Sequence, residues 1–306
     1  MKGTLLILLL MQCPAMTFGQ NVESTLTQYV NRLHTTSSSR IPADLLKEQN
    51  ASEVIRLAGS FYADTLPDVR AKIYYLIARA GTKSFEPSVR RQAVEQLVKA
   101  TTDREVANVG TLWTSLSQFR KNDFTSMATD SLKNSLRNRQ AHLDKLLQLI
   151  GYLELTDLKE TIQSMTYPPS LPRDRWAALL ALSRMDDAEA TQYILLRAQK
   201  QKVDDNVVYE IFPDLIYTRQ REILDYLITV LNSDEKNCHT ADAENEQPVL
   251  CAYRVMEQLA PVIIDYPLSL DKSGDINTTD YAKALADVRL WFKQKGSSYQ
   301  ISKDKF

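Results

Sequence analysis

Glycine is scarce in this sequence. Only 8 of the 306 residues are glycine, well below the roughly 7% of an average protein. Two of the eight, Gly3 and Gly19, lie at the very start of the chain. Folds that cradle phosphate groups or turn many β-hairpins need glycine wherever φ is positive. The shortage therefore argues against a phosphate-binding loop and against a hairpin-rich β fold.

Histidine is also scarce, and the common catalytic patterns are missing. His34, His142 and His239 are the only histidines, and their spacing fits no metal site. The chain contains no His-Glu-x-x-His, no Gly-x-Ser-x-Gly, no P-loop and no dinucleotide-binding glycine pattern. The sequence thus predicts no catalytic residue, no metal site and no cofactor.

A strong charge of either sign is lacking too. The 37 basic and 38 acidic side chains leave a net charge of −1. Nucleic-acid-binding domains usually carry a basic surface, so we expect no nucleic-acid partner. The remaining composition, 44% hydrophobic and 25% charged, is that of an ordinary globular protein with enough apolar material for a core.

The start of the chain, 1–19, has the layout of a secretory signal peptide. Lys2 precedes an apolar run over 4–11, Pro14 interrupts it, and Thr17 and Gly19 stand at the −3 and −1 positions of a cut before Gln20. The alternative is a membrane anchor, although the run is shorter than the ~20 residues of a spanning helix. We expect export to the periplasm or the cell exterior of a bacterium, with no membrane span after cleavage.

Two cysteines remain once such a leader is removed. Cys238 and Cys251 flank a polar, acidic segment, and a pair of cysteines in an exported protein indicates a disulfide. The alternative is a metal site that would use Cys238, His239 and Cys251, but it offers too few ligands at no recognised spacing.

Helical periodicity runs through the rest of the chain. Apolar residues at the spacing of one helix face occur near 69–80, 143–153, 223–231 and 281–292. No sustained two-residue alternation is present, so the predicted class is all-α. Pro67 and Pro87 suit the first turn of a helix, and Thr102 with Glu105 has the spacing of a capping box. Asp186–Glu189 is interpreted as a helix-start cluster.

One segment, 171–190, resembles a HEAT repeat of the bilin-lyase-like kind. Such repeats carry Pro-x-x-Arg-x-x-Ala near a helix start and an Asp-x-x-Ala turn. The matching residues here are Arg175, Ala178, Leu182, Asp187 and Ala190. Looser copies begin at Pro67 and Pro87 and cover 146–162, although the two prolines stand closer together than the family's spacing. The resemblance implies an α-solenoid of stacked antiparallel helix pairs, a HEAT/armadillo-like superhelix.

These observations predict four parts. They are a signal peptide (1–19), an N-terminal helix with a polar linker (20–50), a helical-repeat domain (51–295) with an insertion at 233–249, and a C-terminal tail (296–306). Repeat solenoids usually bind proteins, so we expect a non-enzymatic protein-interaction scaffold. The alternative is an all-α carbohydrate-processing enzyme, suggested by scattered carboxylates and by Trp113, Trp176 and Trp291. For Trp176 the helical register favours packing in the core.

Overall fold

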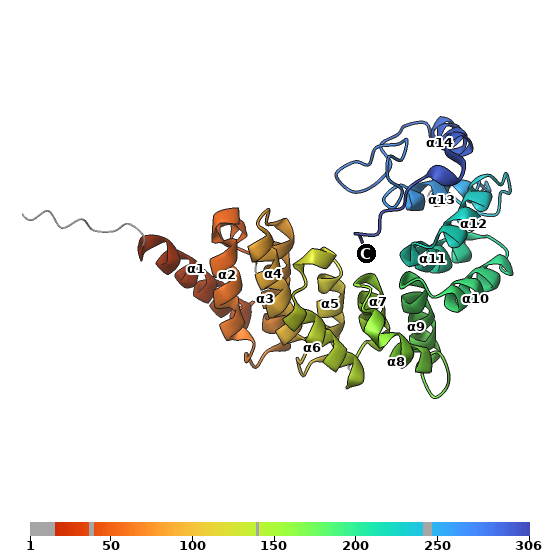
Figure 1. Cartoon of the computed structure of the whole chain (residues 1–306). Coiled ribbons are helices and arrows are strands. Elements are labelled where there is room, and N and C mark those ends of the chain that lie inside the picture. The colour runs from red at the N-terminus through yellow and green to blue at the C-terminus, as the bar shows by residue number, and fades with distance from the viewer. Residues whose placement is uncertain (1–15, 37–39, 139–140, 241–246) are drawn as a thin grey trace, which may run out of the picture. The chain divides into compact units, whose positions relative to one another are not determined.

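A computed structural model of the chain describes residues 16–36, 40–138, 141–240 and 247–306 (Figure 1). Within these ranges all regular secondary structure is helical, and β pairing is limited to isolated bridges. The predicted all-α class is therefore confirmed. Most of the predicted signal peptide, residues 1–15, lies outside the described residues. No helix in the described ranges is long and apolar enough to span a membrane.

The helices follow one another at short intervals. The α-helices of the first part of the chain are α1 (Met16–Thr35), α2 (Ala51–Ala58), α3 (Pro67–Lys83), α4 (Pro87–Ala100), α5 (Val106–Leu116) and α6 (Ser126–Arg137). Those that follow are α7 (Leu143–Tyr152), α8 (Lys159–Ser164), α9 (Pro172–Arg184), α10 (Ala188–Gln199), α11 (Phe212–Thr218), α12 (Arg221–Leu231), α13 (Ala252–Leu259) and α14 (Tyr281–Lys295). A π-helical turn, Val207–Ile211, leads into α11.

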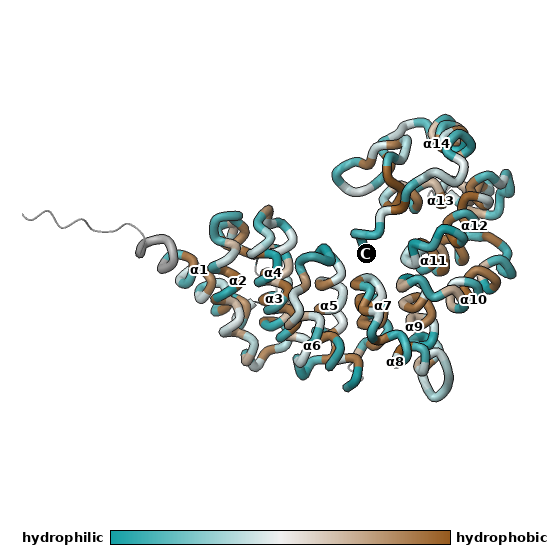
Figure 2. Tube along the Cα trace, viewed as in Figure 1, coloured by the Kyte–Doolittle hydropathy of each residue, from teal (hydrophilic) through white to brown (hydrophobic). Residues whose placement is uncertain are grey.

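Local sequence explains several helix starts. Pro67, Pro87 and Pro172 each occupy the first turn of their helix, where a missing N–H costs nothing and φ is already helical. The helices carry both hydrophobic and hydrophilic residues (Figure 2). Hydrophobic residues at helical spacing gather on one face, which must be covered by a neighbour. The four stretches with predicted helical periodicity correspond to α3, α7, α12 and α14.

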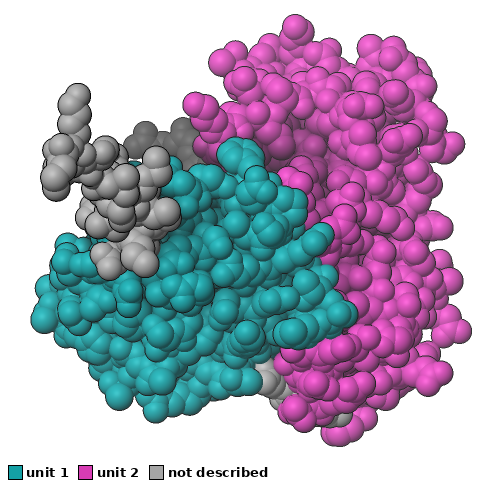
Figure 3. Space-filling model, turned by 60° about the vertical axis from the view of Figure 1, so that its left-hand side comes forward, with its two compact units in different colours: residues 1–119, 123–128 teal, residues 120–122, 129–306 magenta. Residues whose placement is uncertain are grey.

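The contacts divide the chain into two compact units (Figure 3). Unit 1 comprises the residues up to Phe119 together with Asp123–Ala128, and unit 2 comprises Arg120–Asn122 together with Thr129–Phe306. Each unit has its own pattern of helix contacts.

In unit 1 the repeat advances by single helices. The starts of α3, α4 and α5 follow one another at nearly equal intervals. The helix α2 contacts α3 and α4, α3 contacts α4 and α5, and α4 contacts α5. The Pro67 and Pro87 motif copies therefore mark successive helices rather than successive helix pairs. A close approach joins α3 and α4: a Cβ on Gly81 would overlap the Cβ of Ala93, so only glycine fits there.

In unit 2 the repeat advances by helix pairs. The helices α7, α9, α11 and α13 contact one another in order, and α8, α10 and α12 pack beside them. Left-handed residues follow the ends of α7, α9 and α11 at Glu154, Asp186 and Arg219, and the intervals between them are nearly equal. Gly151 of α7 allows a close approach to α9, because a Cβ there would lie 2.7 Å from the Cα of Ala181.

Candidate functional site

A groove of about 640 Å³ lies on unit 2, between the connection that leads into α9, α9 itself, and α10. Its polar and aromatic lining comes from all three elements. The lining includes Tyr167, Arg175, Trp176, Asp187, Tyr193 and Arg197. Tyr167 and Tyr193 are largely exposed for residues of their size, so the groove presents aromatic side chains to solvent.

Trp176 is the most constrained aromatic residue of the groove. Its indole N–H donates a hydrogen bond to Oδ2 of Asp214 at 2.6 Å, and the guanidinium of Arg197 lies 5.1 Å from the ring centroid, within the range of a cation–π interaction. Burial raises the pKa of Asp214 above its ordinary value, and the indole hydrogen bond opposes that effect. Core packing was expected for Trp176, but the side chain is only partly buried and lines the groove.

Arginines at the fourth position of α3 and α4 show what the Pro-x-x-Arg motif does in unit 1. Arg70 donates two hydrogen bonds to the carboxylate of Asp103, at 2.7 and 2.8 Å, and a third to the carbonyl of Asp64. Arg90 donates to Asp123 at 2.9 Å and to the carbonyls of residues 84 and 85. Each arginine thus binds carbonyls shortly before it and an aspartate 33 residues after it.

The side chains of the Arg70–Asp103 pair are buried. The two side chains are 2% and 0% exposed, and the hydroxyl of Tyr74 also donates to Asp103 at 2.6 Å. Burial by itself would raise the pKa of Asp103, but hydrogen bonds from Arg70 and Tyr74 hold that pKa well below its ordinary value. A buried pair of this kind is costly to break, because removal of one partner leaves an uncompensated charge.

Arg175 occupies the same fourth position of α9, yet it lacks this arrangement. The residue one such interval later is Val208, which cannot accept a hydrogen bond through its side chain. Among the described residues the guanidinium of Arg175 forms no ion pair and no hydrogen bond, and it faces the groove. The motif that closes a buried ion pair in unit 1 therefore presents an arginine without an ion-pair partner to the groove in unit 2.

The other residues of the HEAT-like motif are structural. Ala178, Leu182 and Ala190 are buried. Asp187 is the N-cap of α10 and accepts a hydrogen bond from the amide of Ala190 at 2.9 Å, as the helix-start interpretation predicts. Glu189, in the first turn of α10, also lines the groove and is exposed.

The predicted capping box at Thr102 and Glu105 is wrong. The hydroxyl of Thr102 donates to the carbonyl of Lys99 instead, and α5 begins directly after Glu105 without a side-chain cap. Asp103 accepts from the amide of Glu105 at 2.7 Å while it binds Arg70. Asp103, which lies between the two expected capping residues, therefore forms the structural contact.

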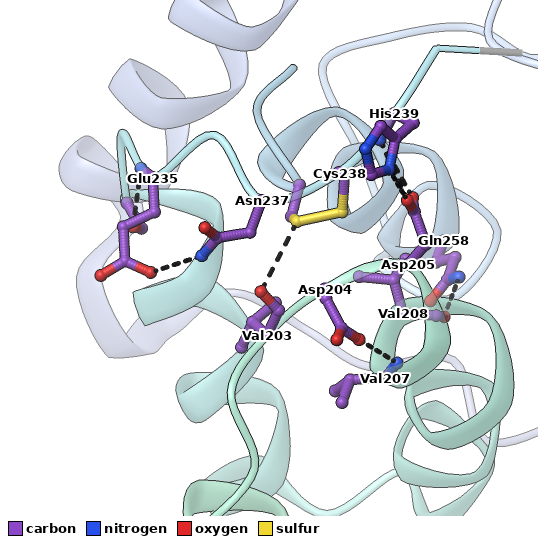
Figure 4. The surroundings of a disulfide bond; sticks show 12 residues. Val203, Asp204, Asp205, Val207, Val208, Glu235, Asn237, Cys238, His239 and Gln258 are labelled. Carbon is purple, nitrogen blue, oxygen red and sulfur yellow. Dashed lines mark hydrogen bonds and ion pairs between the residues drawn. A yellow bond between two sulfur atoms is a disulfide. The ribbon is translucent and has the colours of Figure 1, made fainter. Parts of the chain in front are cut away.

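Cys238 and Cys251 form a disulfide (Figure 4). Both are buried, and the backbones of Cys238 and Val249 form a reciprocal pair of hydrogen bonds. The imidazole of His239 is bonded to Asp205 at 2.7 Å and takes no part in a sulfur-containing site. In the parts of the chain that the structure describes, no group of three or more His, Cys, Asp or Glu residues is placed to hold a metal ion.

A scan against protein-family models, a search of curated proteins and a search of solved structures all found no match for this chain. Function must therefore be inferred from the groove, the repeat pattern and the disulfide.

Proposed function

We propose that this chain is an exported, non-enzymatic scaffold whose groove on α9 and α10 binds another protein. The observation that carries this proposal is the set of side chains in the groove. Tryptophan, tyrosine and arginine dominate the energetics of protein interfaces, and Trp176, Tyr193 and Arg175 supply all three. Among the described residues Arg175 forms no ion pair and no hydrogen bond, so its N–H groups are available to a ligand carboxylate or carbonyl.

The helix arrangement supports a HEAT-type solenoid as the scaffold. Helix pairs that recur at nearly regular intervals, as they do from α7 to α12, are typical of α-solenoids, in which each pair buries its apolar face only against its neighbours. Such repeats present extended surfaces to protein partners. The HEAT assignment itself rests on the motif at 171–190 and on this pairing.

Export is supported by two features of the chain. The leader pattern over 1–19 predicts cleavage before Gln20, and a buried disulfide between Cys238 and Cys251 is typical of oxidising compartments. The direct test is expression of the full chain in a bacterial host, followed by N-terminal sequencing of the periplasmic or secreted product. We expect Gln20 as the first residue; an uncleaved, membrane-bound product would refute the export proposal.

Site-specific crosslinking tests the groove. A photoreactive amino acid replaces Tyr193, which is 51% exposed, and in a matched control it replaces Tyr75 of unit 1, which is 48% exposed. Irradiation of envelope extracts is expected to yield a discrete crosslinked protein from position 193 only. Equal products from both positions, or none from either, would contradict a protein-binding groove on α9 and α10.

One observation favours the second candidate, an all-α carbohydrate-processing enzyme. The carboxylates of Asp187 and Glu189 lie in the same groove as Trp176 and Tyr193, and aromatic rings stack on sugars. Asp187, however, is engaged as a helix cap. Release of reducing ends from bacterial polysaccharides, abolished by Glu189→Gln, would favour this candidate over the scaffold.

A further inference from the structure

The charged side chains that line the groove on α9 and α10 balance one another. Among the described residues they are Arg175 and Arg197, which are basic, and Asp187 and Glu189, which are acidic. The lining therefore brings no net charge to the groove at neutral pH. A strongly acidic or strongly basic segment would meet like charges there as well as opposite ones, and like charges brought together at an interface are unfavourable. The charge balance favours a neutral ligand.

The hydrogen-bonding groups of the groove, in contrast, are mainly donors. In the part of the chain that the structure describes, neither Arg175 nor Arg197 uses its guanidinium in a hydrogen bond or an ion pair. Each guanidinium carries several N–H donors and no acceptor. Asp187 already accepts from the amide of Ala190, so Glu189 is the only described carboxylate of the lining without an internal bond. A ligand that fits this groove has more acceptors than donors.

Trp176 contributes a fixed ring and no free donor. Its indole N–H is bonded to Asp214 of α11 at 2.6 Å, and the guanidinium of Arg197 on α10 lies 5.1 Å from the ring centroid. Because contacts from two neighbouring helices hold the ring, little side-chain freedom remains to be lost when a ligand packs against it. The indole therefore offers the ligand apolar surface in a preset position.

Two exposed tyrosines add to the aromatic surface. Tyr167, in the connection that leads into α9, is 64% exposed, and Tyr193 lies on the exposed side of α10; both line the groove. Their hydroxyls can donate as well as accept, so they leave the surplus of donors unchanged. The ligand must then be neutral, rich in acceptors, and able to pack flat apolar groups against aromatic rings.

A proline-rich segment matches the groove in each of these respects. Proline carries no charge and has no N–H. In a polyproline II helix the carbonyl groups form no internal hydrogen bonds, so the segment presents acceptors with almost no donors. Its pyrrolidine rings pack in aromatic-lined grooves, and the helix is ordered before it binds. The ordering cost of binding is therefore small.

A carbohydrate would pack on the same rings but does not match the donors. Each sugar hydroxyl both donates and accepts, so a bound sugar needs acceptors from the groove about as often as it needs donors. With Arg175 and Arg197 supplying donors and Glu189 as the unengaged carboxylate among the described lining residues, sugar hydroxyl protons would find few partners. Polar groups left unpaired on binding cost free energy, which favours the proline-rich segment.

We infer that the partner segment bound in this groove is proline-rich and adopts the polyproline II conformation. Its rings pack against Tyr167, Trp176 and Tyr193, and its carbonyls accept hydrogen bonds from Arg175 and Arg197. This inference rests on the proposed protein-binding function and names the chemistry of the ligand.

The test uses the full chain and two fluorescein-labelled peptides. Decaproline is the probe, because it is neutral and forms a polyproline II helix. A decamer of alternating glycine and serine, neutral but flexible, is the control peptide. Tyr193→Ala removes a ring from the groove, and Tyr75→Ala removes a tyrosine of similar exposure from unit 1. Arg175→Met removes the donors of one guanidinium and keeps much of the side-chain volume.

Fluorescence anisotropy should show that decaproline binds about tenfold more tightly than the glycine–serine peptide, a difference of one decade in Kd. Tyr193→Ala and Arg175→Met should each weaken the binding of decaproline by about tenfold, whereas Tyr75→Ala should bind as the native chain does. Because the probe and the groove are both neutral, added salt should change the Kd by less than about twofold.

Equal binding of the two peptides, no binding of decaproline, or an unchanged Kd in Tyr193→Ala or Arg175→Met would overturn this inference. Displacement of decaproline by maltohexaose would also overturn it, because the groove would then take a sugar. Failure of the proposed function is seen separately, as the absence of a discrete crosslinked protein from position 193. A discrete crosslinked protein together with equal binding of the two peptides would overturn the proline-rich ligand and leave the groove as a protein-binding site.

Discussion

Units 1 and 2 use the same helix-start arginine in opposite ways. In unit 1, Arg70 and Arg90 are each bound to an aspartate 33 residues later, and the pairs hold successive helices together. In unit 2, Arg175 has Val208 at that distance, and its guanidinium faces a groove lined by aromatic residues. The comparison teaches that the motif alone does not assign a role; the residue one repeat further along decides between packing and binding.

The repeating element also differs between the two units. Unit 1 advances by one helix at a time, and its buried pairs tie each helix to the loop before the next helix but one. Unit 2 advances by helix pairs, and Arg184 and Arg219 at its helix ends bind main-chain oxygens of the C-terminal segment. Unit 1 thus pairs its motif arginines with aspartates, whereas in unit 2 Arg175, Arg184 and Arg219 form no ion pair with a side-chain carboxylate among the described residues.

The largest expected difference between the units is in the free energy of unfolding when the helix-start arginine is removed. Arg70→Met leaves Asp103 as a buried, uncompensated charge and should lower the free energy of unfolding by about 3–5 kcal/mol. Arg175→Met, the matched change in unit 2, breaks no ion pair and should change it by less than about 0.5 kcal/mol. Urea unfolding followed by circular dichroism measures both. Similar losses in the two variants would remove the distinction between the units.

Acidification should remove the contribution of Asp103 to the stability of unit 1. Since the pKa of this carboxyl is lowered on folding, the stabilisation is present above the unfolded value of 3.8 and is lost as pH falls toward the lower folded value. The difference in unfolding free energy between the native chain and Asp103→Asn should therefore shrink between about pH 5 and about pH 2. A difference that stays constant over this range would show that the carboxylate is not held by Arg70 and Tyr74.

Loss of the disulfide should lower the stability of unit 2 alone. Cys238 and Cys251 are 13 residues apart, and loss of such a crosslink costs about 3 kcal/mol through the entropy of the unfolded chain. The double variant Cys238→Ser/Cys251→Ser should expose the amides of α12 and α13 to faster hydrogen exchange, with those of α3 and α4 unchanged. Faster exchange throughout the chain would mean that the two units unfold as one.

The two units should lose similar amounts of stability when a glycine at a helix contact is replaced by alanine. Gly81→Ala in unit 1 and Gly151→Ala in unit 2 each place a methyl group in steric overlap with a neighbouring helix. Overpacking of this kind costs about 1–3 kcal/mol. Both variants should therefore lose a similar amount of unfolding free energy, measured by thermal unfolding. Gly59→Ala, where φ is helical and a Cβ would meet only the end of the Gln96 side chain at 3.1 Å, controls for the general effect of replacing glycine. A loss confined to one unit would mean that the helices approach closely only there.

Local sequence was sufficient to predict the helices, the prolines that start them, the cap at Asp187 and the pairing of Cys238 with Cys251. These features depend on residues close together in the chain or on a single chemical pair. The Arg70–Asp103 pair was not predicted, because the motif names only the arginine and its partner lies 33 residues away.

The contact of Arg184 and Arg219 with the C-terminal segment could not be predicted from the sequence for a related reason. Arg184 meets the carbonyl of Lys303 across 119 residues, and nothing in the composition of 296–306 marks it as a bound segment. Arg184 and Arg219 do share one structural feature: each lies at the end of a helix, close to or on a residue with positive φ. In the sequence alone, either arginine looks the same as one at an ordinary solvated helix end.

Crosslinking in the Arg175→Met background tests the central claim most directly. With the photoreactive amino acid at position 193, the yield of crosslinked partner should fall about tenfold or more relative to native Arg175, equal to the loss of a charged hydrogen bond at an interface. The free energy of unfolding should stay unchanged. An undiminished yield, or a fall that merely follows a loss of stability, would show that Arg175 serves the fold as Arg70 does, and the contrast between the units would be refuted.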